Sequence, residues 1–389
     1  MKGTAAVGFN LLILFMPPSL WCPAGPVGIP FKGIPDAKGG ERMRFYTRQH
    51  KYYCGVDLHA RSIYVCILNQ EGAVLLHKNL RAKPDAFLAV IAPFREDLVV
   101  AVECMFTWYW IADLCAREGL TFVLGHALYM KAIHGGKAKN DRIDSHKIAH
   151  LLRGGNVPFS YVYPEAMRAT RDLLRRRNFL MRKRAELLAH IQNTNSQYNL
   201  PDIDGALRYP ANREDLSERF TDDSVKKSIE TDLALIDVYD RNLKEVELYL
   251  TRHAKVDDPN SYHILKTVPG VGQILGLVLL YEIHDIARFP SVQDFVSYCR
   301  LIRCSKESAG KKLGTGGRKI GNAHLKWAFS EATCLFLRGN GAAQKYLARL
   351  ESKHGKGKAL GILSRKLGTA VYYMLKRQEA FDMNKFFEK

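Results

Sequence analysis

The chain has 389 residues, 47% of them hydrophobic, and carries a formal net charge of +19 at pH 7. This length is enough for two or three domains with cores of their own. The basic excess favours a partner with a phosphate backbone. Because no apolar run is long enough to span a bilayer, we exclude an integral membrane protein and expect nucleic acid as the partner.

The eight cysteines form no C-x-x-C pair and no Cys/His cluster with the spacing of a zinc site. Several of them fall within predicted apolar strands or helices. They are therefore expected to be buried thiols, which is typical of a protein of the reducing cytoplasm.

Residues 1–42 differ in character from the rest of the chain. Phe9–Met16 resembles a short signal-peptide core, but the charge and cysteine pattern downstream does not suit a secreted protein. The Pro- and Gly-rich stretch that follows predicts no regular fold. We expect translation to begin at Met43, so that residues 1–42 are either not translated or a disordered leader.

The segment 51–160 is predicted to fold as one α/β domain. Strands are expected at Tyr52–Leu58, Ile63–Leu68, Ala73–His77, Leu98–Val102 and Thr121–Leu124, and helices at Pro84–Arg95 and Trp108–Glu118. Three antiparallel strands followed by alternating helices and strands is the order of an RNase H-like fold, a mixed sheet with helices on both sides. Composition alone does not distinguish this from other α/β folds, but the placement of the acidic residues favours it.

Four acidic residues stand out in so basic a chain. Asp57 and Glu103 end two apolar strands, where a sheet opens to a ligand, and Asp141 and Asp144 share one face of a helix predicted over Lys137–Leu152. Brought together, their carboxylates would repel unless a divalent cation neutralised them, and oxygen ligands suit Mg²⁺ or Mn²⁺. The pattern predicts a two-metal phosphoryl-transfer site. The alternative for each acid is an ordinary surface or capping residue.

Two long helices are predicted within residues 165–255, at Glu165–Gln197 and from Ser224 to His253. Leucines recur at helical spacing in both, which predicts a helical hairpin or coiled coil. The first helix carries a dense run of arginines, and we expect DNA or RNA contacts from Arg175, Arg176 and Arg177. A solvated charged spacer and a dimerisation arm are the alternatives.

Residues 260–385 are predicted to form a third, mostly helical region that ends in an amphipathic helix at Leu360–Phe381. A V-P-G-V-G turn containing Gly270 and Gly272 precedes an apolar helix, Ile274–Ile283. The turn resembles a helix-hairpin-helix element, whose backbone N–H groups can bind a DNA phosphate. A tight turn that needs glycine only for backbone geometry is the alternative.

The segment 300–326 is expected to be a flexible basic loop leading into a helix at Asn322–Leu337. It contains eight Lys or Arg residues and one Glu. A serine among cations suits a nucleophile that attacks a phosphodiester, and the candidate is Ser308, flanked by Lys311, Lys312, Arg318 and Lys319. No neighbouring His or acid supplies a base, so a solvated charged loop is the alternative.

Several motifs, in order, resemble the DEDD-type insertion-sequence transposases of the IS-one-ten family, relatives of the site-specific DNA invertases. The similarity covers roughly Lys51 to the C-terminus. It rests on G-V-D-L-H, A-V-E-C, K-A-K-N-D-R-I-D-S-H, V-P-G-V-G and S-A-G-K-K-L-G-T-G-G-R-K-I-G-N-A-H-L-K-W-A-F-S-E-A. Residues 1–42 depart from the family pattern and touch none of these motifs.

The resemblance implies an N-terminal RuvC-like domain whose acidic tetrad is Asp57, Glu103, Asp141 and Asp144. It also implies a C-terminal transposase domain with a serine nucleophile at Ser308, with Ser305 in reserve. Family members use a composite site built by domains of different protomers, so a homo-oligomer, a dimer or a tetramer, is expected. A structured noncoding RNA from the end of the element pairs with both target and donor DNA.

We therefore predict a DNA recombinase that excises and inserts its own mobile element through metal-assisted cleavage and a phosphoserine link. The first alternative is a structure-specific nuclease, similar to Holliday-junction resolvases, in which the tetrad activates water. The second is a nucleic-acid-binding protein without chemistry, against which the intact tetrad argues. A covalent protein–DNA adduct on a suicide substrate would separate recombinase from nuclease.

Overall fold

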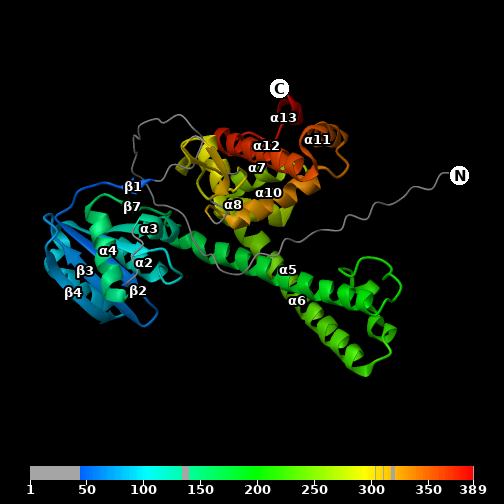
Figure 1. Cartoon of the computed structure of the whole chain (residues 1–389), viewed down its shortest axis with the longest axis horizontal. Coiled ribbons are helices and arrows are strands. Elements are labelled where there is room, and N and C mark those ends of the chain that lie inside the picture. Colours follow the sequence, from blue (N-terminus) through cyan, green and yellow to red (C-terminus); the bar gives the residue numbers. More distant parts are fainter. Residues whose placement is uncertain (1–43, 134–139, 303, 310, 317–319, 389) are drawn as a thin grey trace. The chain divides into compact units, whose positions relative to one another are not determined.

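The computed structural model describes two compact units, which are treated separately (Figure 1). The first comprises Phe45–Ser160 and the second extends from Tyr161. The described residues are 44–133, 140–302, 304–309, 311–316 and 320–388. The leader predicted at residues 1–42 and two of the expected DNA-contacting residues, Arg318 and Lys319, lie outside them.

The first unit is a mixed five-stranded sheet with helices packed on it, as predicted. Its strands follow the order β4-β3-β2-β5-β6; β2, β3 and β4 are antiparallel neighbours, and β5 and β6 continue parallel to β2. This topology is consistent with an RNase H-like domain. The strands are β1 (Phe45–Tyr46), β2 (Tyr52–Leu58), β3 (Ser62–Leu68), β4 (Val74–Arg81), β5 (Leu98–Glu103), β6 (Thr121–Gly125) and β7 (Val157–Pro158). The helices are α1 (Pro84–Ile91), α2 (Tyr109–Arg117), α3 (Ala127–Ile133) and α4 (Asp141–Arg153), with a 3-10 helix, η1 (Ala92–Asp97).

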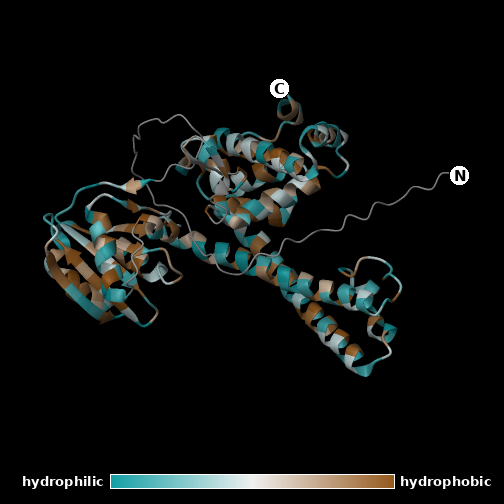
Figure 2. Cartoon of the chain, viewed as in Figure 1, coloured by the Kyte–Doolittle hydropathy of each residue, from teal (hydrophilic) through white to brown (hydrophobic). Residues whose placement is uncertain are grey.

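The central strands are apolar on both faces because both faces are buried. Figure 2 shows these strands as largely hydrophobic. Helix α4 packs across β2 and β3, and its residues Ile148, Ala149 and Leu152 share a core with Tyr53 of β2 and its neighbours. The close approach requires Gly55, since a Cβ there would lie within 3.0 Å of the backbone of Ser145 and Ala149. Gly55 therefore allows α4 to lie directly on β2.

Three predicted boundaries in this unit are wrong. The helix expected to run to Arg95 ends at Ile91, because Pro93 cannot continue the hydrogen-bonding pattern and a 3-10 turn takes over. Strand β4 runs on to Arg81, and its mostly exposed residues give no alternating pattern by which to find its end. The helix expected from Lys137 begins at Asp141, since Asn140 is its N-cap and accepts from the Ile143 backbone N–H.

The second unit begins with two long helices that run side by side, α5 (Glu165–Gln197) and α6 (Asp223–Asp257). Helix α5 has the predicted bounds. The connection between the two helices contains 3-10 turns η2 (Pro210–Arg213) and η3 (Leu216–Arg219). Its residues Leu207, Leu216 and Phe220 pack against Ile191 and Ile229 to form a small core at the tip of the hairpin.

The rest of the second unit is a helical bundle around α8, in which every residue from Leu275 to Ile283 is buried. The elements are α7 (Pro259–Lys266), α8 (Gln273–Ile283), η4 (Ile286–Arg288), α9 (Val292–Tyr298), β8 (Cys304–Ser308), β9 (Lys311–Gly316), α10 (Ala323–Phe336), α11 (Gly341–His354), α12 (Lys356–Arg377) and α13 (Met383–Phe387). Within the described residues, no helix is both long enough and apolar enough to cross a membrane.

Two features of this bundle differ from the prediction. The segment expected to be a flexible loop contains an antiparallel hairpin of β8 and β9. Its strands, C-S-K-E-S and K-K-L-G-T-G, are mostly polar or glycine, so no apolar alternation indicated them. The last long helix ends at Arg377, where Gln378 adopts a left-handed conformation, and α11 and α13 were not predicted.

We predict that Gly55→Ala lowers the free energy of unfolding by about 1–3 kcal/mol, the usual cost of overpacking a core. Urea denaturation measures the change. The matched control is Gly361→Ala in α12, where a Cβ meets nothing within 4 Å and helix propensity favours alanine. Equal stability of Gly55→Ala and the parent chain would show that α4 does not lie this close to β2.

Candidate active site

The pairing of β2 with β5 places two of the predicted acids side by side. Val56 pairs with Val102 in parallel register, so Asp57 and Glu103 are the next residues on neighbouring strands. Side chains alternate between the faces of a strand, and both acids fall on the face to which Gly55 and Ala101 belong. That face is covered by α4.

Helix α4 brings the other two acids to the same end of the sheet. Its residues Ser145 and Ala149 lie over Gly55, so the turn before them extends toward Asp57. Asp141 and Asp144 belong to this first turn, where the helix dipole favours negative charge. Asp144 is also held by Lys147, whose Nζ lies 3.4 Å from its Oδ1.

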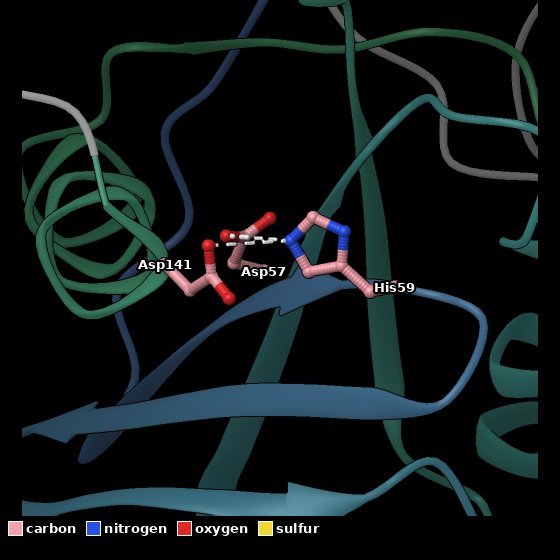
Figure 3. A group of neighbouring side chains, drawn as sticks. All are labelled: Asp57, His59 and Asp141. Atoms are coloured by element: carbon pink, nitrogen blue, oxygen red, sulfur yellow. Dashed lines mark ion pairs between the residues drawn. The ribbon is translucent and has the colours of Figure 1, made fainter.

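A histidine side chain points toward two of the acids, as Figure 3 shows. The Nε2 atom of His59 is 3.3 Å from Asp57 Oδ2 and 3.5 Å from Asp141 Oδ1. One possible ligand atom from each of the three residues lies within 4.8 Å of the other two. His59 was not among the predicted site residues. Its spacing in D-L-H, two positions after Asp57 in extended chain, is the signal that could have identified it.

The electrostatics of Asp57 show that this cluster is strained without a counter-charge. Burial raises the pKa of Asp57, and the Asp141 and Asp144 carboxylates add to that rise while His59 opposes it. Its side chain is 15% exposed, against 54% for Asp141. Two carboxylates and an imidazole around one point form a donor set that fits a divalent cation, with Glu103 and Asp144 beside it.

The predicted nucleophile lies in the second unit, at the tip of the β8–β9 hairpin. Ser308 pairs with Lys311 across a turn of two residues, and both are exposed. Ala309 in the turn has φ of +48°, as tight hairpin turns require. The reserve candidate, Ser305, pairs with Thr315 within the strands.

Comparison with known proteins identifies the family of the chain. Residues 262–348 match the transposase family described as IS116/IS110/IS902, and residues 54–199 match the DEDD transposase family of IS110. The chain belongs to the IS116/IS110/IS902 family of transposases. It is therefore a DNA-processing enzyme, as the motifs predicted. It is also similar to the transposase for insertion sequence element IS1111A of Coxiella burnetii, with 23% identity over 337 residues, 84% of this chain and 90% of that protein.

A buried carboxylate in this transposase holds the N-cap of α10, the helix that follows the β8–β9 hairpin in sequence. Glu282 of α8 accepts from Arg171 and Arg175 of α5, and Asn322 Nδ2 donates to it over 2.7 Å. The Asn322 side chain also caps α10. Burial alone raises the pKa of Glu282, but the two guanidinium groups outweigh it and hold that pKa well below its usual range. The ionised carboxylate thus ties the start of α10 to α5 and α8.

The arginine run on α5 is largely used inside the protein, which corrects part of the predicted DNA-binding set. Arg175 is buried against Glu282, and Arg177 pairs with Glu247 of α6 at 2.6 Å. Both guanidinium groups are thereby neutralised within the unit. Of the three predicted arginines, only Arg176 is exposed, with its guanidinium over the Phe179 ring.

The V-P-G-V-G turn combines a packing role with an open position. Gly270 has φ of +85°, and a Cβ there would lie 2.6 Å from the backbone of Leu335 and Phe336, so close packing against α10 explains this glycine. At Gly272, the N-cap of α8, a Cβ would meet nothing within 4 Å. Both glycines are exposed, but only at Gly272 would a Cβ meet no neighbouring atom.

We predict that Glu282→Gln lowers the free energy of unfolding by about 3–5 kcal/mol, because two buried guanidinium groups lose their counter-charge. Urea denaturation measures it. The control is Glu247→Gln, whose partner Arg177 is 11% exposed and whose own side chain is 35% exposed, so its loss should be smaller.

The pH dependence provides a second check of Glu282. A pKa that is lower in the folded than in the unfolded state stabilises the protein above the unfolded pKa, and this contribution is lost as the pH falls through the folded pKa. The difference in the free energy of unfolding between the parent chain and Glu282→Gln should therefore become smaller only in strong acid. An equal loss of unfolding free energy in Glu282→Gln and Glu247→Gln would contradict the assignment of Glu282 as the buried counter-charge.

Proposed function

We propose that this transposase excises and inserts its own insertion sequence by cutting DNA at the carboxyl ends of β2 and β5. The observation that carries this proposal is the convergence of Asp57, His59 and Asp141, whose ligand atoms lie within 4.8 Å of one another. Asp57, Glu103, Asp141 and Asp144 would hold Mg²⁺ or Mn²⁺. When bound, these cations orient the scissile phosphate and neutralise the charge that develops on it.

The protein itself contributes a fixed arrangement of acids. The strands hold Asp57 and Glu103 in parallel register, and the capped first turn of α4 fixes Asp141 and Asp144. The His59 imidazole can donate to either Asp57 or Asp141 and so keeps these two carboxylates at a common point. Such preorganisation removes the need to assemble the site during the reaction.

We further propose that Ser308 is the nucleophile. Its hydroxyl lies at an exposed turn beside Lys311, whose ammonium can neutralise a phosphate oxygen. The Ser308 oxygen forms a bond to phosphorus as a bridging P–O bond breaks, its proton passes to solvent, and the leaving strand keeps a hydroxyl group. Attack by a DNA hydroxyl on the phosphoserine reverses the step, so rejoining needs no ATP.

Target choice and assembly complete the proposal. The family resemblance supports a homo-oligomer, a dimer or a tetramer, and an element-encoded noncoding RNA that pairs with target and donor DNA. The proposed phosphate contacts are the side chains of Lys311, Lys312, Arg318, Lys319 and Arg176 and the turn at Gly270 and Gly272. Phosphate contacts carry no sequence information, so the RNA would choose the site while the protein supplies affinity and chemistry.

A second candidate mechanism is that of a structure-specific nuclease. The observation that favours it is that all four acids belong to the first unit, so water could be activated there without Ser308. In that case Ser308 is only a residue of the hairpin turn. The two mechanisms differ in whether DNA becomes covalently attached to the protein.

We predict that Asp57→Asn and Asp141→Asn each abolish strand cleavage while leaving the fold intact. Because the pKa of Asp57 is raised in the folded protein, its ionised form costs stability as the pH rises through that pKa. Asp57→Asn should therefore raise the thermal unfolding midpoint of metal-free protein at pH 7. Mg²⁺ or Mn²⁺ should stabilise the parent chain and not this variant.

The control for this experiment is Asp85→Asn, an exposed acid in the first turn of α1. It should cleave DNA at the parental rate and keep the metal-induced rise in the unfolding midpoint. Cleavage by Asp57→Asn at the parental rate would remove the acid site from the mechanism.

Ser308→Ala should stop cleavage without weakening DNA binding, because the hydroxyl takes part in bond making and not in phosphate contacts. A nicked suicide substrate should trap a covalent adduct with the parent chain and none with Ser308→Ala. Ser305→Ala is the matched comparison and should cleave normally. Cleavage without any adduct in the parent chain would favour the nuclease mechanism, and loss only in Ser305→Ala would move the nucleophile to that residue.

A further inference from the structure

The loop between β5 and α2 exposes an aromatic ring immediately beyond the acid site. Its sequence after Glu103 is C-M-F-T-W, and Phe106 is 69% exposed, the most exposed large apolar side chain among the described residues. The neighbouring Met105 is 47% exposed. Two exposed apolar side chains beside a site of carboxylates indicate a ligand that has an apolar face as well as a charged group.

The exposure of Phe106 is imposed by the loop. Cys104 and Trp108, on either side, are buried at 2% and 1% exposure and anchor the segment. The Cys104 backbone N–H donates to the Gly125 carbonyl over 2.9 Å. Thr107 Oγ1 donates to the Leu58 carbonyl over 3.3 Å. Both flanks of Phe106 are thus anchored, to β6 through Gly125 and to β2 through Leu58.

The same hydrogen bonds place the ring beside the acids. Phe106 follows Glu103 by three residues, a span of at most about 11 Å of extended chain. Thr107 contacts the carbonyl of the residue directly after Asp57. With a rise of about 3.4 Å per nucleotide, the ring lies within about three nucleotides of a phosphate held at the acids.

We propose that Phe106 stacks on a nucleobase of the DNA strand whose phosphodiester is held by the acid site, and so keeps that base out of the duplex stack. This inference rests on the proposed function. Aromatic rings stack on bases of any sequence, and a ring this close to a held phosphate is within reach of the bases that flank it. A protein partner would need a broader apolar patch than one ring and one methionine.

Paired deletions of the ring and of the base test the inference. The substrate is a duplex that joins the end of the element to its flanking DNA, and a set of variants carries one abasic nucleotide at each of the three positions on either side of the cleaved bond. Phe106→Ala should slow single-turnover cleavage of intact DNA on the order of 10-fold. Phe106→Tyr should restore the rate, and Phe106→Leu should not.

The decisive result is a lack of additivity at one position. There, the effect of Phe106→Ala should disappear: on DNA that lacks the base, Phe106→Ala and the parent chain should cleave at the same rate. The inference would be overturned if the losses of cleavage rate from the two deletions multiplied at every position. Cleavage by Phe106→Ala at the parental rate would also overturn it. Val74→Ala, a 49% exposed apolar residue at the opposite end of the sheet, is the matched control and should behave as the parent chain.

The same four combinations of protein and DNA, with and without the ring and the base, can be compared by DNA affinity in the Asp57→Asn background. This comparison separates the inference from the proposed function. If the losses in DNA affinity from Phe106→Ala and from the missing base are not additive in this background, stacking is supported even if Asp57 proves dispensable for cleavage. If they are additive, stacking is contradicted even if Asp57 proves essential. 5-Iodouracil at the same position should photocrosslink to Phe106 in the DNA strand. A crosslink found only with iodouracil in RNA would overturn the assignment to DNA.

Discussion

The position of the acidic side chains depends on how closely α4 approaches β2. Gly55 lets the backbone of Ser145 and Ala149 rest on the strand, and one helical turn earlier the same helix presents Asp141 beside Asp57. A helix held farther away by a side chain would carry its carboxylate out of reach. Burial, and after it the nearby Asp141 and Asp144 carboxylates, raise the pKa of Asp57, so the arrangement of acids costs stability when Asp57 is ionised.

The basic excess of the chain is distributed unevenly between structural and exposed roles. In the second unit Arg171, Arg175 and Arg177 lie in ion pairs with Glu282 and Glu247, and they stabilise helix packing. Arg184 is similarly paired with Asp240 of α6. The density of arginines along α5 therefore overstates the charge that this helix can offer to a phosphate backbone.

Sequence reasoning was most successful where hydrophobic pattern and chain order decide the outcome. The buried strands, the bounds of α5 and the placement of Asp57 and Glu103 at strand ends all follow from apolar periodicity. It failed where local polar composition hides a regular structure, as in the β8–β9 hairpin, whose pairing depends on backbone hydrogen bonds and a two-residue turn. The inward direction of Arg175 was equally hidden, because its partner Glu282 lies 107 residues away in sequence. His59 was missed because its role requires Asp141, which only the fold brings near it.

The β8–β9 hairpin that carries Ser308 is an insert between α9 and α10 whose two ends are anchored to each other. Arg300 Nε donates to the Ile320 carbonyl over 2.8 Å, and the Asn322 backbone N–H donates to the Tyr298 carbonyl over 2.6 Å, so the two ends of the insert are clamped together. Because loop-closure entropy grows slowly with length, the packing of the helices should depend little on the length of the segment between residues 300 and 320. A change in that length would therefore move the hairpin turn relative to the clamp and leave the helix packing unchanged.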